Sequence, residues 1–562
     1  MLREGMNMRL ILGVAFICRL ILAFRPSYFH PDEHLQGPQE IAYGMFGWAS
    51  QTPWEFTSEH PIRSFVPLWL LYGIPMRFFH KDSNPLHVLW TLRAVFAVLT
   101  WVLEDMAVER LAVTRNDKLR CLFFVSTSYA TLTWQAHTFS NSLETILVLW
   151  FLVILFEAES STSQPFMSPF DRYYDNFLLG MIVTLGIFNR PTFLAFISFP
   201  SLCLPNIWRK SYGSFFVFLF SLCLTTGLFI GIDTYLYNSD TWVIAPLNFA
   251  LYNTSSNNLA EHGTHSRLQH LFTNLPTLLG PGLLMLKPNW HSLPVQTIAG
   301  GLLFLSLIPH QEARFLLPLV PLICMQMDLK QYASATVRKT LMILWLTFNL
   351  FCAIFLGLYH QSGVIPAQVH ISELARPLTV IWWRTYTPPL WITGLPHDNV
   401  EFGALSDIRN DLDYVRELAS KGAHTDASYD DSVDADKRDI ALSANDTLIE
   451  IDLQGANTTI LKEIVELCGD KEVLVMVPDA VKDQFFSIFN TDPVNEKGTK
   501  STEKSASKEI IPPRVWRSSS FLSPDLLFQG PHFWSSPWGL SMYNVSGLNY
   551  SVTSEISSDT NE

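Results

Sequence analysis

Long apolar segments recur along the chain from Met8 to about Tyr359, and they limit the possible fold more than any other feature. The first is Met8–Phe24, and the others are Phe65–Phe79, Leu86–Leu103, Leu119–Trp134, Leu143–Phe156, Phe177–Phe188, Thr192–Leu204, Phe215–Leu236, Leu268–Leu286, Val295–Ile308, Phe315–Met325 and Leu341–Leu358. Inside a bilayer the backbone finds no water to bond, so only α-helices and closed barrels can span it. A crossing helix needs about 20 apolar residues, and several of these segments are shorter. We therefore expect an α-helical polytopic membrane protein with roughly eight to twelve crossings.

The first apolar segment has the length of a signal peptide, but no small-residue cleavage site follows it. The later apolar segments need a membrane in any case, so we predict that Met8–Phe24 is the first spanning helix. Arg19 lies within it and Arg25 lies at its end, where either side chain could snorkel to the interface.

The polar part of the chain is acidic. Of the 51 acidic residues, 30 lie after Gln361, against 16 of the 38 basic residues, so the formal net charge of −13 belongs to the C-terminal part. Binding of nucleic acid needs a basic footprint, and this acidic balance argues against it. The seven cysteines include no CxxC pair and lie mostly inside apolar segments, which argues against a disulfide framework and against a thiolate zinc site.

A concentrated polar stretch, His30-Pro31-Asp32-Glu33-His34-Leu35-Gln36, directly follows the first apolar segment, and we interpret it as the reaction centre. Pro31 and Pro38 suit the first turn of a helix, and the acidic side chains then meet the positive end of the helix dipole. We therefore expect two short helices. Because adjacent residues do not share a helix face, Asp32 and Glu33 cannot both face one hydroxyl. One should act as a base while the other orients a histidine or a backbone donor.

The same stretch also fits an inverted zinc-peptidase pattern, in which two histidines at i and i+4 enclose a glutamate. Here these are His30, Glu33 and His34. The pattern needs an uninterrupted helix and a third ligand, whereas Pro31 and Pro38 bracket this motif. We therefore predict no metal site.

A carboxylate at a membrane surface can act instead as a general base that takes a proton from an attacking hydroxyl. A sugar linked through phosphate to a lipid is a suitable electrophile, because phosphate leaves well once arginine or a helix N-terminus stabilises its charge. Pro309-His310-Gln311-Glu312-Ala313-Arg314-Phe315, between two apolar segments, supplies a cation. Charged residues at membrane depth are functional by default, although a short solvated loop is the plainer interpretation of this cluster taken alone.

Several further motifs accompany these two in the order found in one enzyme family. The set is His30–Gln36, Trp54-Glu55-Phe56 with Arg63-Ser64, His137-Thr138-Phe139-Ser140-Asn141-Ser142-Leu143-Glu144-Thr145, Asn189-Arg190-Pro191-Thr192, His310-Gln311-Glu312-Ala313-Arg314-Phe315 and Trp383-Arg384-Thr385-Tyr386-Thr387-Pro388-Pro389. Over residues 8–396 the chain thereby resembles the endoplasmic-reticulum mannosyltransferases of glycosyltransferase family 22. The set is far more specific than any of its members.

Within that family, His34-Leu35-Gln36 resembles the enzymes that add the fourth mannose to the glycosylphosphatidylinositol (GPI) anchor precursor. Third-mannose enzymes tend to carry Tyr-Trp-Gln at this place, and the N-glycan mannosyltransferases depart further. Leu35 stands where Phe is more frequent, a change that nearly conserves volume.

The resemblance implies a C-type glycosyltransferase (GT-C) fold of many helices in the endoplasmic-reticulum membrane, with a site that faces the lumen. It implies that the donor substrate is dolichyl-phosphate-mannose and that no metal or other cofactor takes part. It also implies that the donor's β linkage is inverted to an α-1,2 bond on the third mannose of the GPI-precursor acceptor.

The resemblance also assigns roles to residues. Asp32 is expected to deprotonate the acceptor hydroxyl, with Glu33 as the alternative base. The residues expected at the substrates are His30, His34, Arg63, Asn141, Glu144, Arg190, His310, Glu312 and Arg314.

Among these residues, Arg314 and Arg190 are the expected ligands of the donor phosphate. For Arg63, Asn141 and Glu144 a structural role is at least as strongly expected, because polar residues between helices often serve only to satisfy their neighbours.

In chain order, we expect a first transmembrane helix over 1–29, a lumenal catalytic loop over 30–64 and a multi-spanning domain over 65–360. An interfacial aromatic and Pro-rich segment over 361–399 and a polar, acidic C-terminal region over 400–562 follow.

Within the C-terminal region, Thr447–Leu453, Thr458–Cys468 and Glu472–Pro478 have the patterns of a strand, a helix and a strand, so we predict a small α/β unit. Residues 492–507 have the composition of a linker. Sequons at Asn445, Asn457, Asn544 and Asn549, if used, place this region in the lumen.

Two alternatives remain open on the sequence. A polytopic transporter or flippase would also carry intramembrane charge, but transporters tend to show internal repeats, and we find none. A third-mannose or N-glycan enzyme of the same family is the nearest rival function.

The polar loop Asn238–His270 is either a lid or acceptor contact or, more commonly, an ordinary solvated connection.

Overall fold

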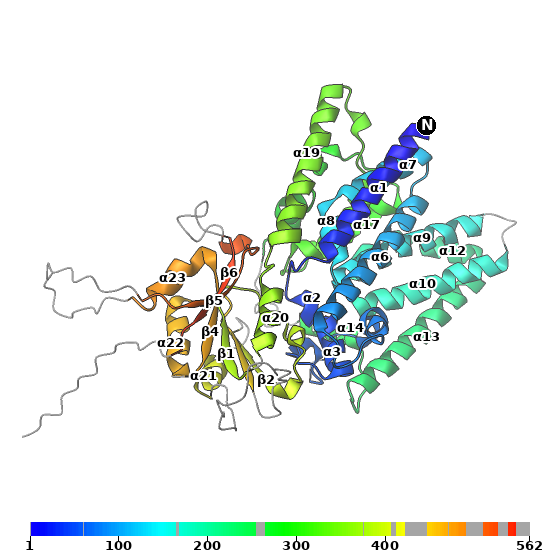
Figure 1. Ribbon diagram of the computed structural model, residues 1–562. Helices are drawn as coiled ribbons and strands as arrows, with labels where there is room; N and C mark the ends of the chain where they lie inside the picture. The colour runs from blue at the N-terminus through cyan, green and yellow to red at the C-terminus, as the bar shows by residue number, and fades with distance from the viewer. Residues whose placement is uncertain are drawn as a thin grey trace, which may run out of the picture. The chain divides into compact units, whose positions relative to one another are not determined.

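The computed structural model describes residues 2–59, 61–163, 168–254, 265–374, 376–405, 412–421, 447–469, 471–490, 510–526 and 538–546. The chain forms two compact units (Figure 1). The membrane unit runs to Leu358 but excludes Pro26–Tyr28, and the C-terminal unit contains Pro26–Tyr28 and the chain from Tyr359. Tyr28 is tied to the C-terminal unit by bonds from its N–H to the carbonyl of His360 (3.0 Å) and from its hydroxyl to that of Thr387 (2.8 Å).

The membrane unit is built of helices. Its described α-helices are α1 (Leu2–Ala23), α2 (Asp32–Leu35), α3 (Pro38–Phe46), α4 (Phe65–Leu68), α5 (Ile74–Met76), α6 (Pro85–Leu111), α7 (Arg115–Thr127), α8 (Tyr129–Thr133), α9 (Ser140–Ser163), α10 (Pro169–Asn189), α11 (Phe193–Ile197), α12 (Leu204–Lys210), α13 (Tyr212–Leu236), α14 (Ala245–Thr254), α16 (Leu275–Leu279), α17 (Leu293–Ser306), α18 (Leu319–Met325) and α19 (Ala335–Ile354). Short 3₁₀ turns cover Trp54–Phe56, Trp134–Ala136, Pro200–Cys203, Gly280–Met285, Ala313–Leu316 and Leu329–Gln331, and π turns cover Trp69–Gly73, His270–Asn274 and Phe355–Tyr359. The two short helices expected after His30 are thus confirmed as α2 and α3.

Four helices within the described residues are long and apolar enough to cross a membrane: Pro85–Leu111, Ser140–Ser161, Tyr212–Leu236 and Ala335–Tyr359. Other apolar segments are divided into shorter pieces. The segment predicted over Leu119–Trp134, for example, is broken between α7 and α8 at Ser128, whose backbone is extended. A multi-pass membrane protein is therefore confirmed, while the expected eight to twelve crossings stay a prediction.

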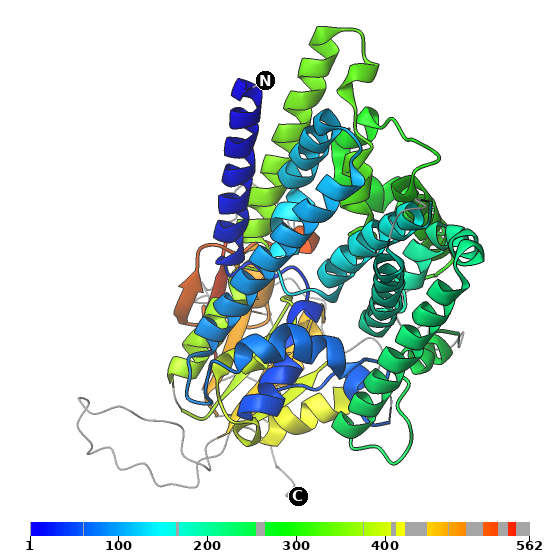
Figure 2. The same ribbon diagram turned by 90° about the vertical axis from the view of Figure 1, so that its right-hand side faces the viewer.

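Helices α9, α10 and α13 pack together as neighbours (Figures 1 and 2). At Gly180 of α10, an added Cβ would lie 2.8 Å from the carbonyl oxygen of Phe218 on α13. The absence of a side chain lets the two backbones approach closely, and the Ser221 hydroxyl donates across the contact to the carbonyl of Phe177 (2.6 Å). Small residues with hydroxyl bonds are the usual packing device between membrane helices.

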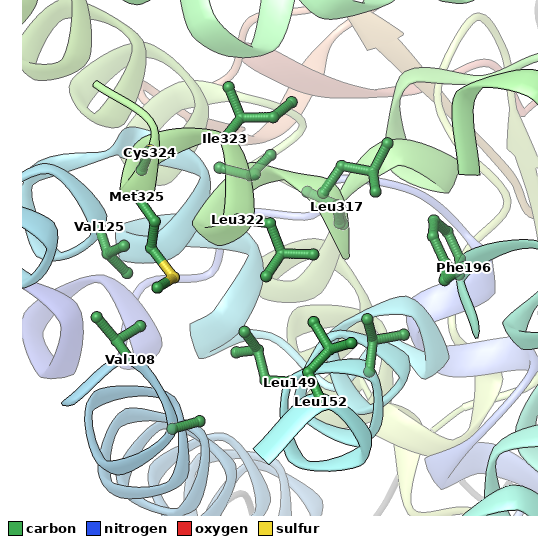
Figure 3. Close-up of a cluster of buried hydrophobic side chains, with 14 of the residues drawn as sticks. Val108, Val125, Leu149, Leu152, Phe196, Leu317, Leu322, Ile323, Cys324 and Met325 are labelled. Carbon is green, nitrogen blue, oxygen red and sulfur yellow. The ribbon is translucent and has the colours of Figure 1, made fainter. Parts of the chain in front are cut away.

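The apolar core of the membrane unit draws on helices far apart in the chain. Figure 3 shows Val108 of α6, Val125 of α7, Leu149 and Leu152 of α9 and Phe196 of α11 gathered in one cluster. The same cluster contains Leu317 and the α18 side chains Leu322–Met325. Leu316 also belongs to this cluster, so the core holds the 3₁₀ turn Ala313–Leu316, which carries Arg314.

Helix α1 packs on α6, α7 and α8 (Figure 1). Arg19 does not snorkel: its side chain is 2 % exposed and donates to Glu104 of α6 (3.1 Å), to the Thr100 hydroxyl (2.7 Å) and to the Gln135 carbonyl (3.3 Å). Burial of a charge requires such a partner. The pair cannot be predicted from Arg19 alone, because Glu104 lies 85 residues away in the chain.

The C-terminal unit is an α/β unit. Its described elements are α20 (Val364–Leu374), β1 (Leu378–Trp382), β2 (Val400–Ala404), α21 (Leu412–Lys421), β3 (Leu448–Asp452), α22 (Thr458–Cys468), β4 (Val473–Pro478), α23 (Lys482–Ser487), β5 (Arg514–Ser518) and β6 (Leu540–Asn544), with 3₁₀ turns at Leu390–Thr393, His397–Asn399, Asp479–Val481 and Pro524–Leu526. In the described residues the strand order is β2-β3-β1-β4-β6-β5, parallel from β2 to β4 and antiparallel from β4 to β5. The predicted strand, helix and strand are confirmed as β3, α22 and β4. The linker expected over 492–507 lies outside the described residues.

The segment 361–399, predicted as an interfacial aromatic and Pro-rich segment, is part of the C-terminal unit. It contains β1, which pairs with both β3 and β4. Trp382 and Trp383 are fully buried. The aromatic residues that suggested a membrane interface therefore fill the core of the sheet. Aromatic side chains suit both environments, and the sequence pattern does not distinguish them.

The two faces of β3 have different surroundings, because successive side chains of a strand point to opposite faces. Ile449 and Ile451 pack with the apolar side chains of α21 and α22. Glu450 and Asp452 point to the other face. There Glu450 accepts from Nε2 of Gln368 on α20 (2.7 Å) and from Nε1 of Trp382 (2.8 Å), while Asp452 accepts from the Thr387 hydroxyl (2.7 Å). Figure 1 shows α20 opposite α22 across the sheet.

Glu450 is fully buried and has no cationic partner among the described residues, and burial raises its pKa to about 7. A carboxyl whose pKa is raised in the folded state stabilises that state below its unfolded pKa of about 4.5, and this contribution is lost as the pH rises through about 7. We predict that Glu450→Gln flattens this dependence and stabilises the C-terminal unit by up to about 3 kcal/mol at pH 8. Pulse proteolysis of the full-length protein in detergent at pH 5 and pH 8 measures this. Glu466→Gln, at an exposed position of α22, is the control. Equal pH dependence in the unmodified protein and in both variants would contradict the prediction.

Candidate active site

Helix α2 is a single turn that follows Pro31, and it sends the two adjacent acids in different directions. Successive residues of a helix are about 100° apart. Asp32 accordingly meets Arg314, and Glu33 meets Arg93. The prediction that the two carboxylates cannot face one hydroxyl is confirmed.

Glu33 is bound in a buried ion pair with Arg93 of α6. Nε and Nη2 of Arg93 lie 2.8 and 2.7 Å from Oε1 of Glu33, and neither side chain is exposed to solvent. Nη1 of Arg93 also donates to the carbonyl of Arg25 (2.8 Å), just after α1. Glu33 therefore anchors the turn that carries Asp32, chiefly through Arg93 and in addition through Thr138.

Asp32 is the more accessible of the two acids, with 20 % of its side chain exposed. Its Oδ2 lies 2.5 Å from Nη1 of Arg314. The backbone N–H of Asp32 and Nη1 of Arg314 both lie 3.2 Å from Nδ1 of His30. Oδ1 of Asp32 lies 3.3 Å from the same nitrogen, so His30 contacts both the acid and the arginine.

Arg314 is shared between Asp32 and a second acid, Glu312. Its Nη2 lies 3.1 Å from Oε1 of Glu312 and its Nε bonds to Oε2, while Nε2 of His310 lies 2.7 Å from the same Oε1. The sequence prediction that His310, Glu312 and Arg314 form one cluster is therefore confirmed in the structure. The cluster extends to Asp32, 282 residues away in the chain.

The electrostatics keep this cluster charged. Burial alone would raise the pKa of the Asp32 carboxyl, but the charges and hydrogen bonds of Arg314 and His30 together outweigh it and hold that pKa well below its usual range. For Glu312, burial raises the pKa while Arg314 lowers it, and the net effect is again a lowered pKa. Burial would lower the pKa of Arg314, but the two carboxylates raise it. Asp32 is therefore an ionised carboxylate, ready to accept a proton.

Phe315 joins Arg314 to the next motif. The guanidinium carbons of Arg190 and Arg314 lie 5.5 and 5.6 Å from its ring centroid, within the range of cation–π contacts. Arg190 ends α10, where its extended backbone precedes Pro191. The motif around Arg190 is thereby brought beside Asp32 and Arg314, as the sequence implied.

Arg190 is itself held by the start of α9. Its Nη1 donates to the Ser140 hydroxyl (2.9 Å), and its Nε lies 3.7 Å from Oε2 of Glu144. Glu144 is fully buried and accepts from the Thr192 hydroxyl (2.6 Å). These bonds link α9 to the turn after α10, so Glu144 has a structural role here.

Arg63 belongs to the charged group that contains Arg190 and Glu144, and Asn141 is buried beside Glu144 on α9. Arg63 pairs with Glu55 through Nη2 (3.1 Å), and its charge acts on both Arg190 and Glu144. Asn141 lies one turn before Glu144 on α9 and is 1 % exposed. Within the described residues neither atom of its amide has a hydrogen-bond partner.

His34 is not brought into this group. It is fully buried, and burial together with the charge of Arg93 holds its pKa well below the usual value, so the ring is neutral. A buried neutral imidazole is not placed to bind a phosphate. Among the described residues, no group of three or more His, Cys, Asp and Glu side chains is arranged to hold a metal ion.

Arg93 is a functional residue that was not predicted from the sequence, although the sequence contains a signal for it. Arg93 is a lone charge in the apolar segment Leu86–Leu103, and such a charge needs a buried partner. Two acids that follow it, Glu104 and Asp105, lie on the same helix as Arg93. Only the fold shows that Glu33 is its partner.

Comparison with known proteins agrees with these motifs. Residues 10–393 match the Alg9-like mannosyltransferase family. The chain is similar to the protein named GPI mannosyltransferase 4 of Yarrowia lipolytica, at 42% identity over 70% of this chain and 79% of the relative. It is also similar to the proteins of the same name in Candida albicans, at 34% identity over 75% and 87% of the two chains, and Saccharomyces cerevisiae, at 34% over 74% and 82%.

The fold also resembles a solved structure, that of ArnT from Cupriavidus metallidurans bound to undecaprenyl phosphate. The TM-score is 0.50 at 10% identity, over 86% of this chain and 94% of ArnT. This likeness supports the fold alone, and the predicted GT-C fold with a small α/β C-terminal region is confirmed. With the family match over most of the chain and the assembled motifs, we conclude that the chain belongs to the Alg9-like mannosyltransferase family and is a multi-pass membrane mannosyltransferase.

Proposed function

We propose that this enzyme transfers mannose from dolichyl-phosphate-mannose to the third mannose of the GPI anchor precursor, so that it adds the fourth mannose. Two observations support this acceptor: the relatives that carry the name GPI mannosyltransferase 4, and the segment His34-Leu35-Gln36. The reaction takes place at the lumenal face of the endoplasmic-reticulum membrane, as in the family that the chain resembles. The undecaprenyl phosphate in ArnT is compatible with a polyprenyl-phosphate donor.

The accessibility of Asp32 is the observation that carries the mechanism. Of the two adjacent acids, Asp32 is partly exposed and ionised, whereas Glu33 is fully buried in its pair with Arg93. A general base must reach the proton that it removes. Asp32 is therefore the base, and Glu33 is a positioning residue.

In the transfer, Asp32 takes the proton of the acceptor 2-hydroxyl while that oxygen attacks C1 of the donor mannose. The C1–O bond to the phosphate breaks, and dolichyl phosphate leaves with the bonding electron pair. Attack from the side opposite the leaving group converts the β linkage into an α linkage. Arg314 stabilises the charge of the leaving phosphate, and the nearby Arg190 adds to the positive potential.

We predict that Asp32→Asn lowers turnover by about 10²–10⁴-fold without loss of inserted protein, because it removes the base but keeps the shape. The measurement is the GPI-precursor lipid profile of cells that lack their own fourth-mannose enzyme and receive this chain or a variant. The three-mannose precursor should disappear with the unmodified chain and persist with Asp32→Asn. Glu59→Gln, an exposed acid of the same loop, is the matched control and should restore the product.

Persistence of the three-mannose precursor with correctly inserted unmodified chain would sink the acceptor assignment, and two-mannose and N-glycan precursors would then be tested. Full activity of Asp32→Asn would exclude Asp32 as the base.

A second prediction concerns pH. With Arg314 present, the low pKa of Asp32 leaves it ionised above about pH 5, so Asp32 causes no loss of kcat/KM between pH 5 and 8. Arg314→Met removes the positive charge beside Asp32, so the pKa of this buried carboxyl rises. The acidic limb of kcat/KM should then move up by at least about one pH unit.

The control for this profile is Glu40→Gln, because Glu40 is a buried carboxyl of the same loop whose pKa burial raises to about 7. An acidic limb that moves with Glu40→Gln but not with Arg314→Met would contradict the assignment to Asp32.

A third prediction separates positioning from stability. Glu33→Gln and Glu104→Gln each leave a buried arginine without its charge partner, and each should cost about 3–5 kcal/mol of stability. Only Glu33→Gln should also lower turnover per folded enzyme, by about tenfold or more, because only Glu33 holds the turn that carries Asp32. Thermal unfolding in detergent and active-site-normalised turnover measure the two effects. Equal turnover in both variants would show that Glu33 is merely structural.

A further inference from the structure

Two aromatic rings from distant segments meet at the end of the loop that follows the reaction centre. Trp54 lies in the 3₁₀ turn Trp54–Phe56, and Tyr252 lies in α14, with ring centroids 4.5 Å apart at an interplanar angle of 36°. Nδ2 of Asn248 in α14 donates to the carbonyl of Pro61 (3.1 Å) and fastens the helix to the loop. Both rings are partly exposed.

A charged pair lies in the same loop as Trp54 of this aromatic pair. Glu55 follows Trp54 in the same turn, and its Oε1 lies 3.1 Å from Nη2 of Arg63, with 13 % and 12 % of the two side chains exposed. The N–H of Ile62 closes the loop on the carbonyl of Glu55 (3.2 Å), and the Tyr237 hydroxyl holds the carbonyl of Arg63 (2.7 Å). Nε of Arg63 is buried and has no partner in the described residues. The pair is thus fixed by its backbone and retains hydrogen-bonding capacity.

Arg63 links this surface to the reacting group. Its charge acts on Arg190, and the guanidinium of Arg190 shares the Phe315 ring with that of Arg314, which binds Asp32. The mechanism proposed above uses Asp32 and Arg314 and leaves Trp54, Glu55 and Tyr252 without a role. A surface that lies largely in the same loop as the base, and that is linked to it through Arg63 and Arg190, is suited to receive the other substrate.

The chemistry of the surface favours a sugar. A pyranose has an apolar C–H face, which packs on aromatic rings, and a rim of hydroxyls, which both donate and accept. Glu55 accepts from hydroxyls, and Arg63 donates to them. A lipid chain would leave the buried Glu55–Arg63 pair unused, and the negative charge of Glu55 disfavours a phosphate.

We propose that Trp54, Tyr252, Glu55 and Arg63 form the subsite for the mannosyl end of the acceptor. This inference rests on the proposed transfer and names the residues that recognise its acceptor. The rings of Trp54 and Tyr252 hold the C–H face of an acceptor mannose, and Glu55 and Arg63 bind its hydroxyls. The subsite thereby places the attacking hydroxyl at Asp32.

The test is steady-state kinetics of the full-length enzyme in detergent, with dolichyl-phosphate-mannose as donor and the three-mannose GPI precursor as acceptor. Trp54→Ala should raise the acceptor KM about tenfold or more, the loss of about one good contact, while the donor KM stays within twofold. Glu55→Gln should raise the acceptor KM in the same way. Trp54→Phe keeps an aromatic face and should recover most of the affinity. Trp290→Ala, at a ring 73 % exposed outside the site, is the matched control and should leave both constants unchanged.

Each other outcome decides the proposal. An unchanged acceptor KM in Trp54→Ala and Glu55→Gln would overturn it, and a rise confined to the donor KM would assign the surface to the donor instead. If the unmodified enzyme transfers mannose to a different mannosyl acceptor, the proposed function fails, and the same variants are measured with that acceptor. The split between acceptor and donor KM then still supports or overturns the subsite.

Discussion

The buried pair between Glu33 and Arg93 is the contact on which the geometry of the site depends. Helix α2 is only one turn long, and a turn of that length has no stability of its own. Two nitrogens of Arg93 on one oxygen of Glu33 fasten it to α6, and a third nitrogen fastens the end of the preceding segment at Arg25. With Glu33 held inward, helix geometry leaves Asp32 facing the other way. One acid is therefore structural so that its neighbour can be chemical.

Much of this arrangement could be predicted from the sequence. Long apolar segments predict membrane helices because the bilayer allows few other structures, and the prolines at 31 and 38 predicted the two short helices that the structure contains. The clustering of His310, Glu312 and Arg314 followed from their adjacency. The meeting of Arg314 with Asp32 was implied by the family resemblance alone, since no local rule relates residues 282 positions apart.

Other features depend on tertiary contacts that no local pattern encodes. Arg19 and Arg93 could each be recognised as charges in apolar helices, but their partners Glu104 and Glu33 are chosen by helix packing. Trp382 and Trp383 look the same in sequence whether they lie in a sheet core or at a membrane interface, and the structure places them in the core. His34 resembles His30 in the motif, yet one turn of helix buries it away from Asp32.

The way in which Arg314 divides its bonds bears on the order of events in the proposed transfer. In the structure Arg314 makes two contacts to Glu312 and one to Asp32. A phosphate that binds through two N–H groups must displace one of these contacts, because a guanidinium has five donors and the contacts to Glu312, Asp32 and His30 leave one unused. The contact to Asp32 is the easier one to break, because it is a single contact, whereas Glu312 makes two contacts to Arg314 and is held additionally by His310. Release of Asp32 removes the charge that lowers its pKa, so the carboxylate becomes a stronger base once the donor is bound. By this route, donor binding prepares the base for the acceptor hydroxyl.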